Sequence, residues 1–187
     1  HEIVAWVRTT WERGEGYSHG SQIVRTIART IFALPKPVRT IRPKFDTWTW
    51  LEKEKIKRMP CPNINTPQFV EYVKSLNIDL IVVCVFPQIL KTAILRTPRF
   101  GVINCHPSLL PRYAGPQPEF WMLKNGEPVA GVTVHIMTEG IDAGDIVAQH
   151  ELIVGETENI GQLSQRQHHA AATLLANVVN AIAQGTI

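Results

Sequence analysis

Apolar residues along most of the chain recur with the periods of strands and helices in alternation. A nearly continuous run of Ile, Leu and Val over residues 78–86 predicts a parallel strand that is covered on both faces. Shorter patterns predict strands at residues 101–105, 132–136 and 146–153, and helices at residues 89–95, 117–123 and 160–183. A further helix is expected to begin at Thr66-Pro67, since Thr caps free amides and Pro suits the first helical position.

The N-terminal part of the chain shows weaker patterns. Alternation over residues 2–7 predicts a strand. Ser21 is a plausible cap for a helix that continues to Phe32, where Ile23, Val24, Ile27 and Ile31 share one face. Residues 38–65 have no sustained period and are predicted to form a loop with short elements.

This order of elements predicts a single α/β domain over residues 1–187. We expect a mainly parallel sheet with helices on both faces and an antiparallel addition near residues 130–153. No apolar run approaches the roughly 20 residues of a membrane span, and the first residues do not resemble a signal peptide. A cytoplasmic location is therefore expected, with Cys61, Cys84 and Cys105 reduced and buried.

The formal charge of +3 hides a basic N-terminal segment. Residues 8–58 carry twelve Lys or Arg against five Asp or Glu. Such a segment can attract phosphate, nucleic acid or a nucleotide-linked substrate, or it can be a solvated cationic face. Both interpretations remain open.

Polar residues stand at the end of the predicted strand 101–105. Asn104 and His106 are two positions apart, so their side chains project from the same side, and a stiff Pro-bounded turn follows them. Ligands of parallel sheets bind beyond the carboxyl ends of the strands. An Asn amide can donate to a developing oxyanion, and His exchanges protons near neutral pH. The alternative is a structural His and a strand-capping Asn.

A second polar cluster lies between the two strands of the antiparallel addition, at residues 139–145. Gly140 and Gly144 allow close approaches that a side chain would forbid. If Asp142 lies near His106, its carboxylate favours the imidazolium and orients the ring. The alternative is a solvated hairpin turn.

The sequence NCHPSLLPRYAG at residues 104–115 resembles the signature of the folate-dependent formyltransferases. This family includes methionyl-tRNA formyltransferase, glycinamide ribonucleotide formyltransferase and the sugar N-formyltransferases. The resemblance continues through residues 125–127, 131–135 and 140–146 in the family's order, whereas residues 11–60 match poorly. It implies a Rossmann-like fold whose first strand and helix are apparently missing before residue 2.

The resemblance implies a catalytic trio of Asn104, His106 and Asp142 that moves a formyl group from 10-formyltetrahydrofolate to an amine, without a metal. Asn104 and a protonated His106 would stabilise the oxyanion, and His135 would support them. The implied donor-binding residues are Phe86, Ile89, Leu90, Met137, Thr138, Glu139, Gly140 and Ile141. Arg112, Tyr113 and Gln117 are the candidates for contact with the acceptor.

The acceptor is expected to be a small amine, such as an aminosugar linked to a nucleotide, because no tRNA-binding domain is visible. Methionyl-tRNA is the less favoured acceptor, and hydrolysis of formyltetrahydrofolate is a further alternative. A non-catalytic folate- or partner-binding module is an alternative of another class. A dinucleotide-binding domain is disfavoured because no Gly-x-Gly-x-x-Gly follows a strand. No membrane partner is expected.

Overall fold

The structure is a computed structural model that describes residues 5–8, 53, 55–61 and 63–187. Its strands are β1 (Ala5–Arg8), β2 (Lys57–Pro60), β3 (Ile81–Val83), β4 (Val102–His106), β5 (Val129–Ile136) and β6 (Ile146–Ile153). Its helices are α3 (Pro67–Ser75), α4 (Thr92–Leu95), α5 (Pro118–Lys124) and α6 (Ile160–Gln184). The predicted helix at residues 21–32 and most of the basic segment 8–58 lie outside the described residues.

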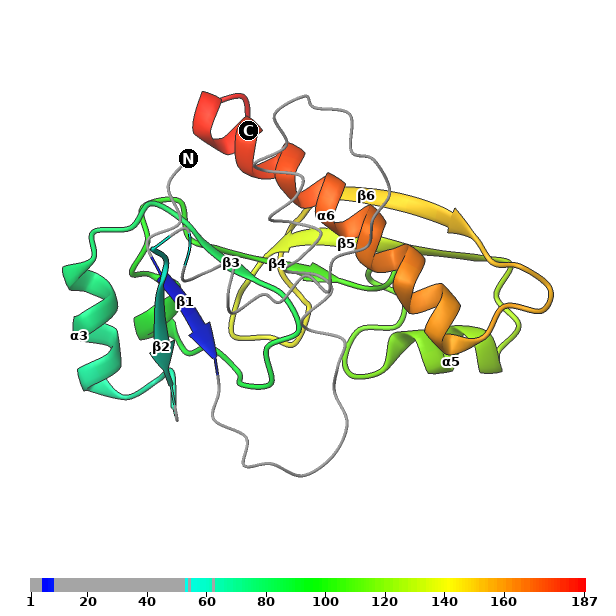
Figure 1. The fold of residues 1–187 in the computed structure, drawn as a ribbon, viewed down its shortest axis with the longest axis horizontal. Coiled ribbons are helices and arrows are strands. Elements are labelled where there is room, and N and C mark those ends of the chain that lie inside the picture. The colour runs from blue at the N-terminus through cyan, green and yellow to red at the C-terminus, as the bar shows by residue number, and fades with distance from the viewer. Residues whose placement is uncertain (1–4, 9–52, 54, 62) are drawn as a thin grey trace.

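A four-stranded sheet in the order β3-β4-β5-β6 forms the centre of the fold (Figure 1). Strands β3 and β4 are parallel, whereas β4, β5 and β6 pair antiparallel. Strands β1 and β2 form a second, parallel pair. The α/β class and the antiparallel addition are therefore confirmed, and the described central sheet is mixed in direction.

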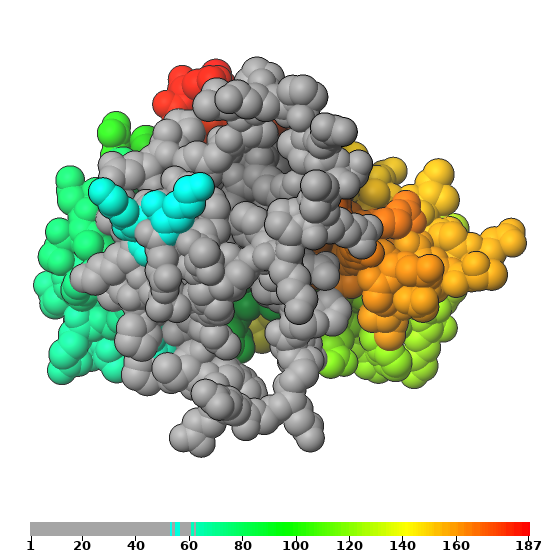
Figure 2. Space-filling view, viewed as in Figure 1, coloured from blue at the N-terminus to red at the C-terminus, as the bar shows by residue number. Residues whose placement is uncertain are grey.

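Helices cover both faces of the central sheet. Helix α6 runs along β5 and β6 (Figure 1), and its Leu175 packs with Ile103 and Cys105 of β4. Val102 of β4 belongs to a second cluster, which includes Val70 of α3. Alternate β4 side chains therefore point to opposite faces. Figure 2 shows α3 at one side of the molecule and the first part of α6 at the other, with the C-terminal end of the chain at the top.

Capping groups mark the ends of two helices, and the start predicted at Thr66-Pro67 is confirmed. Thr66 accepts a hydrogen bond from the Phe69 amide at 3.3 Å, and Pro67 occupies the first turn of α3. Asn159 and Gln162 form a reciprocal capping box at the start of α6. Gly185 ends α6 in the left-handed conformation at φ 67°.

The prediction for residues 78–86 is wrong in two respects. Only Ile81–Val83 forms a strand, and β3 is an edge strand of the described sheet. Val82 is 41% exposed, so the described residues cover its face of the strand only in part, although Leu80 and Cys84 on that face pack against the cluster of Leu175. An apolar run shows that a segment is hydrophobic but not how many of its residues pair with a neighbouring strand. Here the chain leaves the sheet before Val85, which has a left-handed φ of 49°.

Among the described residues, no helix is long and apolar enough to cross a membrane. The three cysteines are free thiols, as predicted. Cys61 and Cys105 are buried, whereas Cys84 is half-buried by surface area. Burial raises the pKa of all three, to about 12 for Cys84. They are therefore packed groups rather than reactive thiolates.

Gly144 lies so close to β5 that it leaves no room for a side chain. A Cβ placed there would meet the Ile136 carbonyl oxygen at 1.8 Å. We predict that Gly144→Ala lowers the free energy of unfolding by about 1–3 kcal/mol, because the loop must move away from the strand. Gly155→Ala is the control, since its nearest contact would be an ordinary 3.6 Å. Equal denaturation midpoints for the two variants would contradict this prediction.

Candidate active site

Asn104 and His106 occupy alternate positions of β4, on the sheet face opposite Ile103 and Cys105. Asp142 lies in the loop between β5 and β6, with a left-handed backbone at φ 47°. The structure brings these three predicted residues together, although they come from two separate segments. The prediction that Asp142 lies near His106 is therefore confirmed.

The Asp142 carboxylate is the common partner of this cluster. Its Oδ1 accepts a hydrogen bond from Asn104 Nδ2 at 3.4 Å. Its Oδ2 lies 3.4 Å from His106 Nδ1 and accepts a bond from the Gly115 amide at 2.8 Å. One carboxylate therefore joins β4, the β5–β6 loop and the loop that precedes α5.

His135 completes the cluster from β5, where it pairs with Asn104 in the strand register. Its Nδ1 lies 2.9 Å from the Ile136 carbonyl oxygen, which can only accept, so Nδ1 carries the hydrogen. Its Nε2 lies 3.2 Å from Asn104 Nδ2 and 3.5 Å from Asp142 Oδ1, so it accepts from the amide when the ring is neutral and donates to the carboxylate when the ring is protonated. His135 is almost fully buried, which agrees with a supporting position behind Asn104.

The hydrogen-bond partners of His106 define its neutral tautomer. Its Nε2 lies 2.9 Å from the Tyr113 carbonyl oxygen, an acceptor, so Nε2 carries the hydrogen. In this tautomer Nδ1 has a lone pair, which faces the Asp142 carboxylate. Nδ1 is therefore the nitrogen that can gain a proton, and Asp142 stabilises the proton once it arrives.

The pKa values of His106 and Asp142 are both lowered in the folded protein. Burial lowers the pKa of His106, and this effect outweighs the bond to Tyr113 and the charge of Asp142, which raise it. Burial alone would raise the pKa of Asp142, but hydrogen bonds from His135 and the Gly115 amide and the nearby histidine charges lower it. His106 is therefore harder to protonate than a free imidazole, and Asp142 ionises more readily than a free carboxylic acid.

The predicted acceptor-contact residues flank the cluster. Tyr113 donates its hydroxyl hydrogen to Glu127 at 2.6 Å, and the exposed Arg112 pairs with the same carboxylate. Gln117 precedes α5 and has a left-handed φ of 54°. Glu127 therefore holds the 112–113 backbone, whose Tyr113 carbonyl binds His106.

The predicted donor-binding residues divide into buried and exposed groups. Leu90 is 1% exposed and belongs to the core, and Phe86 and Met137 pack against that core. Ile89 is 61% exposed and Ile141 is 63% exposed. Of these apolar side chains, Ile89 and Ile141 are therefore the ones that present surface to a ligand.

The predicted donor-binding residues form two segments, residues 86–90 and residues 137–141, and Glu139 links them. Its Oε1 accepts hydrogen bonds from the backbone amide and the hydroxyl of Thr92, at the start of α4. Asn65 fixes the first segment, because its side chain donates to the Ile89 carbonyl at 2.8 Å and accepts from the Lys91 amide at 2.8 Å. Thr138 and Gly140 lie beside Glu139 in the second segment.

Two members of the site were not among the sequence candidates. The Gly115 amide binds Asp142, and Glu127 binds Arg112 and Tyr113. Both residues stand in the motif segments 104–115 and 125–127, but nothing in those letters indicates which backbone group or carboxylate points inward. Within the described ranges, no group of three metal-binding side chains is found.

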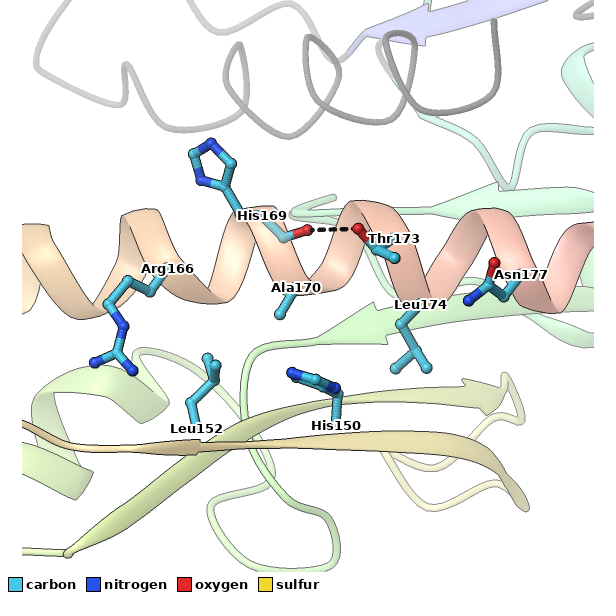
Figure 3. Close-up of a pocket in the computed structure, with 8 residues that line it drawn as sticks. All are labelled: His150, Leu152, Arg166, His169, Ala170, Thr173, Leu174 and Asn177. Carbon is cyan, nitrogen blue, oxygen red and sulfur yellow. Dashed lines mark hydrogen bonds between the residues drawn. The ribbon is translucent and has the colours of Figure 1, made fainter. Parts of the chain in front are cut away.

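A hollow of about 450 Å³ lies elsewhere, between β6 and α6 (Figure 3). His150 and Arg166 extend into it from the strand and the helix (Figure 3). Arg166 is already paired with Glu158 at 2.8 Å. The hollow is lined by none of the residues around Asp142.

The sequence of the chain is similar to those of known proteins. The sequence model of the family described as formyl transferase matches residues 50–179. A methionyl-tRNA formyltransferase of Citrifermentans bemidjiense is 36% identical over 97% of this chain and 54% of its own length. A second, of Syntrophus aciditrophicus, is 46% identical over 63% of this chain and 38% of its own length. The chain thus spans about half the length, or less, of these curated relatives.

The fold also matches solved structures. A phosphoribosylglycinamide formyltransferase from Anaplasma phagocytophilum superimposes with a TM-score of 0.74 and 21% identity, over 88% of this chain and 83% of that one. This likeness supports the Rossmann-like description of the fold.

We predict that Asp142→Asn lowers the pKa of His106 further, because it removes the negative charge that raises this pKa. Asp145→Asn is the matched control, since it makes the same charge change at an exposed position of the same loop. The His106 ring signals, followed by NMR across pH, give both midpoints. An unchanged midpoint in Asp142→Asn, or an equal decrease in both variants, would show that Asp142 does not act on His106.

Proposed function

Since this chain belongs to the formyl transferase family, we propose that it transfers a formyl group from 10-formyltetrahydrofolate to an acceptor amine. The observation that carries the proposal is the Asp142 carboxylate in contact with both Asn104 and His106 at the end of β4. An amide donor and an acid-base pair are the groups that acyl transfer to an amine requires.

Each side chain has one task in this proposal. Asn104 Nδ2, now bonded to Asp142 and His135, donates to the oxygen on which negative charge develops. The neutral His106 accepts the proton of the attacking amine on Nδ1 and later returns it to the leaving nitrogen. Asp142 remains ionised and stabilises the transient imidazolium.

The chain offers suitable surface for the folate donor. When bound, 10-formyltetrahydrofolate supplies the activated formyl carbon. Ile89 and Ile141 expose apolar side chains on the two segments joined by Glu139 and Thr92. Covering these side chains with an aromatic ligand removes apolar surface from water, which supports the assignment. Leu90, Phe86 and Met137 pack in the core beneath this surface.

The acceptor has two candidates. A small amine, such as a nucleotide-linked aminosugar, is the prediction from the sequence. Methionyl-tRNA is the candidate that the names of the two curated relatives favour, at 36% and 46% identity. Both present a primary amine, so the proposed chemistry is the same for either. An assay with each acceptor distinguishes them, and release of formate without an acceptor identifies a hydrolase.

We predict formylation of one of these amines, and a decrease of about 10²–10⁴-fold in the single-turnover rate in His106→Ala. His169→Ala is the matched control, because His169 is exposed on α6 and its imidazole bonds only to the Gln165 carbonyl among the contacts described. Donor binding by calorimetry should be similar in all three proteins, because His106 acts on the proton.

Three outcomes would refute this proposal or a part of it. A folded protein that fails to bind 10-formyltetrahydrofolate contradicts the donor assignment. Rapid transfer by His106→Ala contradicts the acid-base role. Formate production with every amine tried would replace transfer by hydrolysis.

A further inference from the structure

The turn that follows His106 is fastened by side chains from neighbouring strands. The Thr133 hydroxyl of β5 donates to the Ser108 carbonyl at 2.6 Å and accepts from the Leu110 amide at 3.1 Å. Gln149 of β6 donates to the Leu110 carbonyl and to the Thr133 hydroxyl, both at 2.9 Å. Three backbone groups of one short turn are therefore bound by two side chains.

Helix α6 fastens the same turn at its first residue. The Gln167 side-chain amide donates to the Pro107 carbonyl at 2.7 Å and to the Gly131 carbonyl at 2.9 Å. Pro107 directly follows His106. The backbone on the C-terminal side of His106 is therefore held from β5, β6 and α6.

Ser108 links the turn to the Tyr113 carbonyl, which is the hydrogen-bond partner of His106. Its hydroxyl donates to the Arg112 carbonyl at 2.8 Å and lies 3.4 Å from the Tyr113 carbonyl oxygen. The Tyr113 carbonyl accepts the Nε2 hydrogen of His106. A continuous set of hydrogen bonds thus runs from Thr133 through the turn to the imidazole.

The two hydroxyls of this set are inaccessible to water. Ser108 and Thr133 are both 0% exposed. When a buried hydroxyl is removed, its partner loses a hydrogen bond that no solvent replaces, and the backbone must move to find another. A small movement of the Tyr113 carbonyl would release Nε2 of His106.

We propose that Ser108 and Thr133 are positioning residues, which fix the Tyr113 carbonyl against Nε2 of His106 and so reserve Nδ1 for the exchangeable proton beside Asp142. Their effect on rate rests on the proposed function, whereas their effect on the tautomer does not. Neither side chain needs to contact a substrate.

The first test observes the tautomer in the unaltered protein. Ring nitrogen shifts and long-range couplings from ¹⁵N-labelled histidine, above the His106 pKa, should show hydrogen on Nε2 and a lone pair on Nδ1. Hydrogen on Nδ1 would overturn the proposal. No acceptor or donor is needed, so this result stands even if the chain transfers no formyl group.

The second test compares variants that keep or remove the hydroxyl. Thr133→Val and Ser108→Ala should each populate a mixture of His106 tautomers and lower the single-turnover rate on the order of 10- to 100-fold, with donor affinity unchanged. Thr133→Ser retains the hydroxyl and should restore both readouts. Thr97→Val is the control, because the Thr97 hydroxyl binds only the Ala93 carbonyl among the contacts described.

Two results would count against this role. If Thr133→Ser were as damaging as Thr133→Val, the methyl group and packing would matter rather than the hydroxyl. If Thr133→Val and Ser108→Ala both kept the wild-type tautomer, the Tyr113 carbonyl would not depend on them. A variant that fails to fold leaves the test on the unaltered protein decisive.

Discussion

A half-buried carboxylate must be compensated, and the candidate site is built around that requirement. Asp142 stays ionised because its oxygens meet the Gly115 amide and the side chains of Asn104, His106 and His135. Its partners come from β4, β5 and the loop before α5. If the carboxylate were lost, the groups gathered around it would have no common acceptor, and their mutual geometry would relax.

Holding a carboxylate at this place constrains the backbone around it. Asp142 adopts a left-handed φ of 47°, and Gly144 passes close enough to β5 to exclude a Cβ. The turn after His106 is held by its own Ser108 and by three polar side chains from the surrounding elements, namely Thr133, Gln149 and Gln167. The strands and helices thus place the side chains of the site, and hydrogen bonds to the backbone of the loops fix their orientation.

The sequence predicted most of the helices and strands, because they depend on the spacing of apolar residues. It predicted less of the features that depend on contacts between distant parts of the chain. The strand at residues 146–153 and the long helix at residues 160–183 were predicted closely, because the spacing of apolar residues is a local signal. The strand at residues 78–86 was overextended, since an apolar run does not say where pairing stops. The meeting of Asp142 with His106 was anticipated, but the lowered pKa of His106 follows mainly from burial, which local sequence does not report.

The central claim is that Asp142 works through His106, and a double-mutant cycle tests it most directly. Single-turnover rates of the wild type, Asp142→Asn, His106→Ala and the double variant give the coupling between the two side chains. The account predicts that the double variant is scarcely slower than the slower single variant, because removal of either group already disables the acid-base pair. Fully multiplicative losses would contradict it and would mean that the two residues act independently.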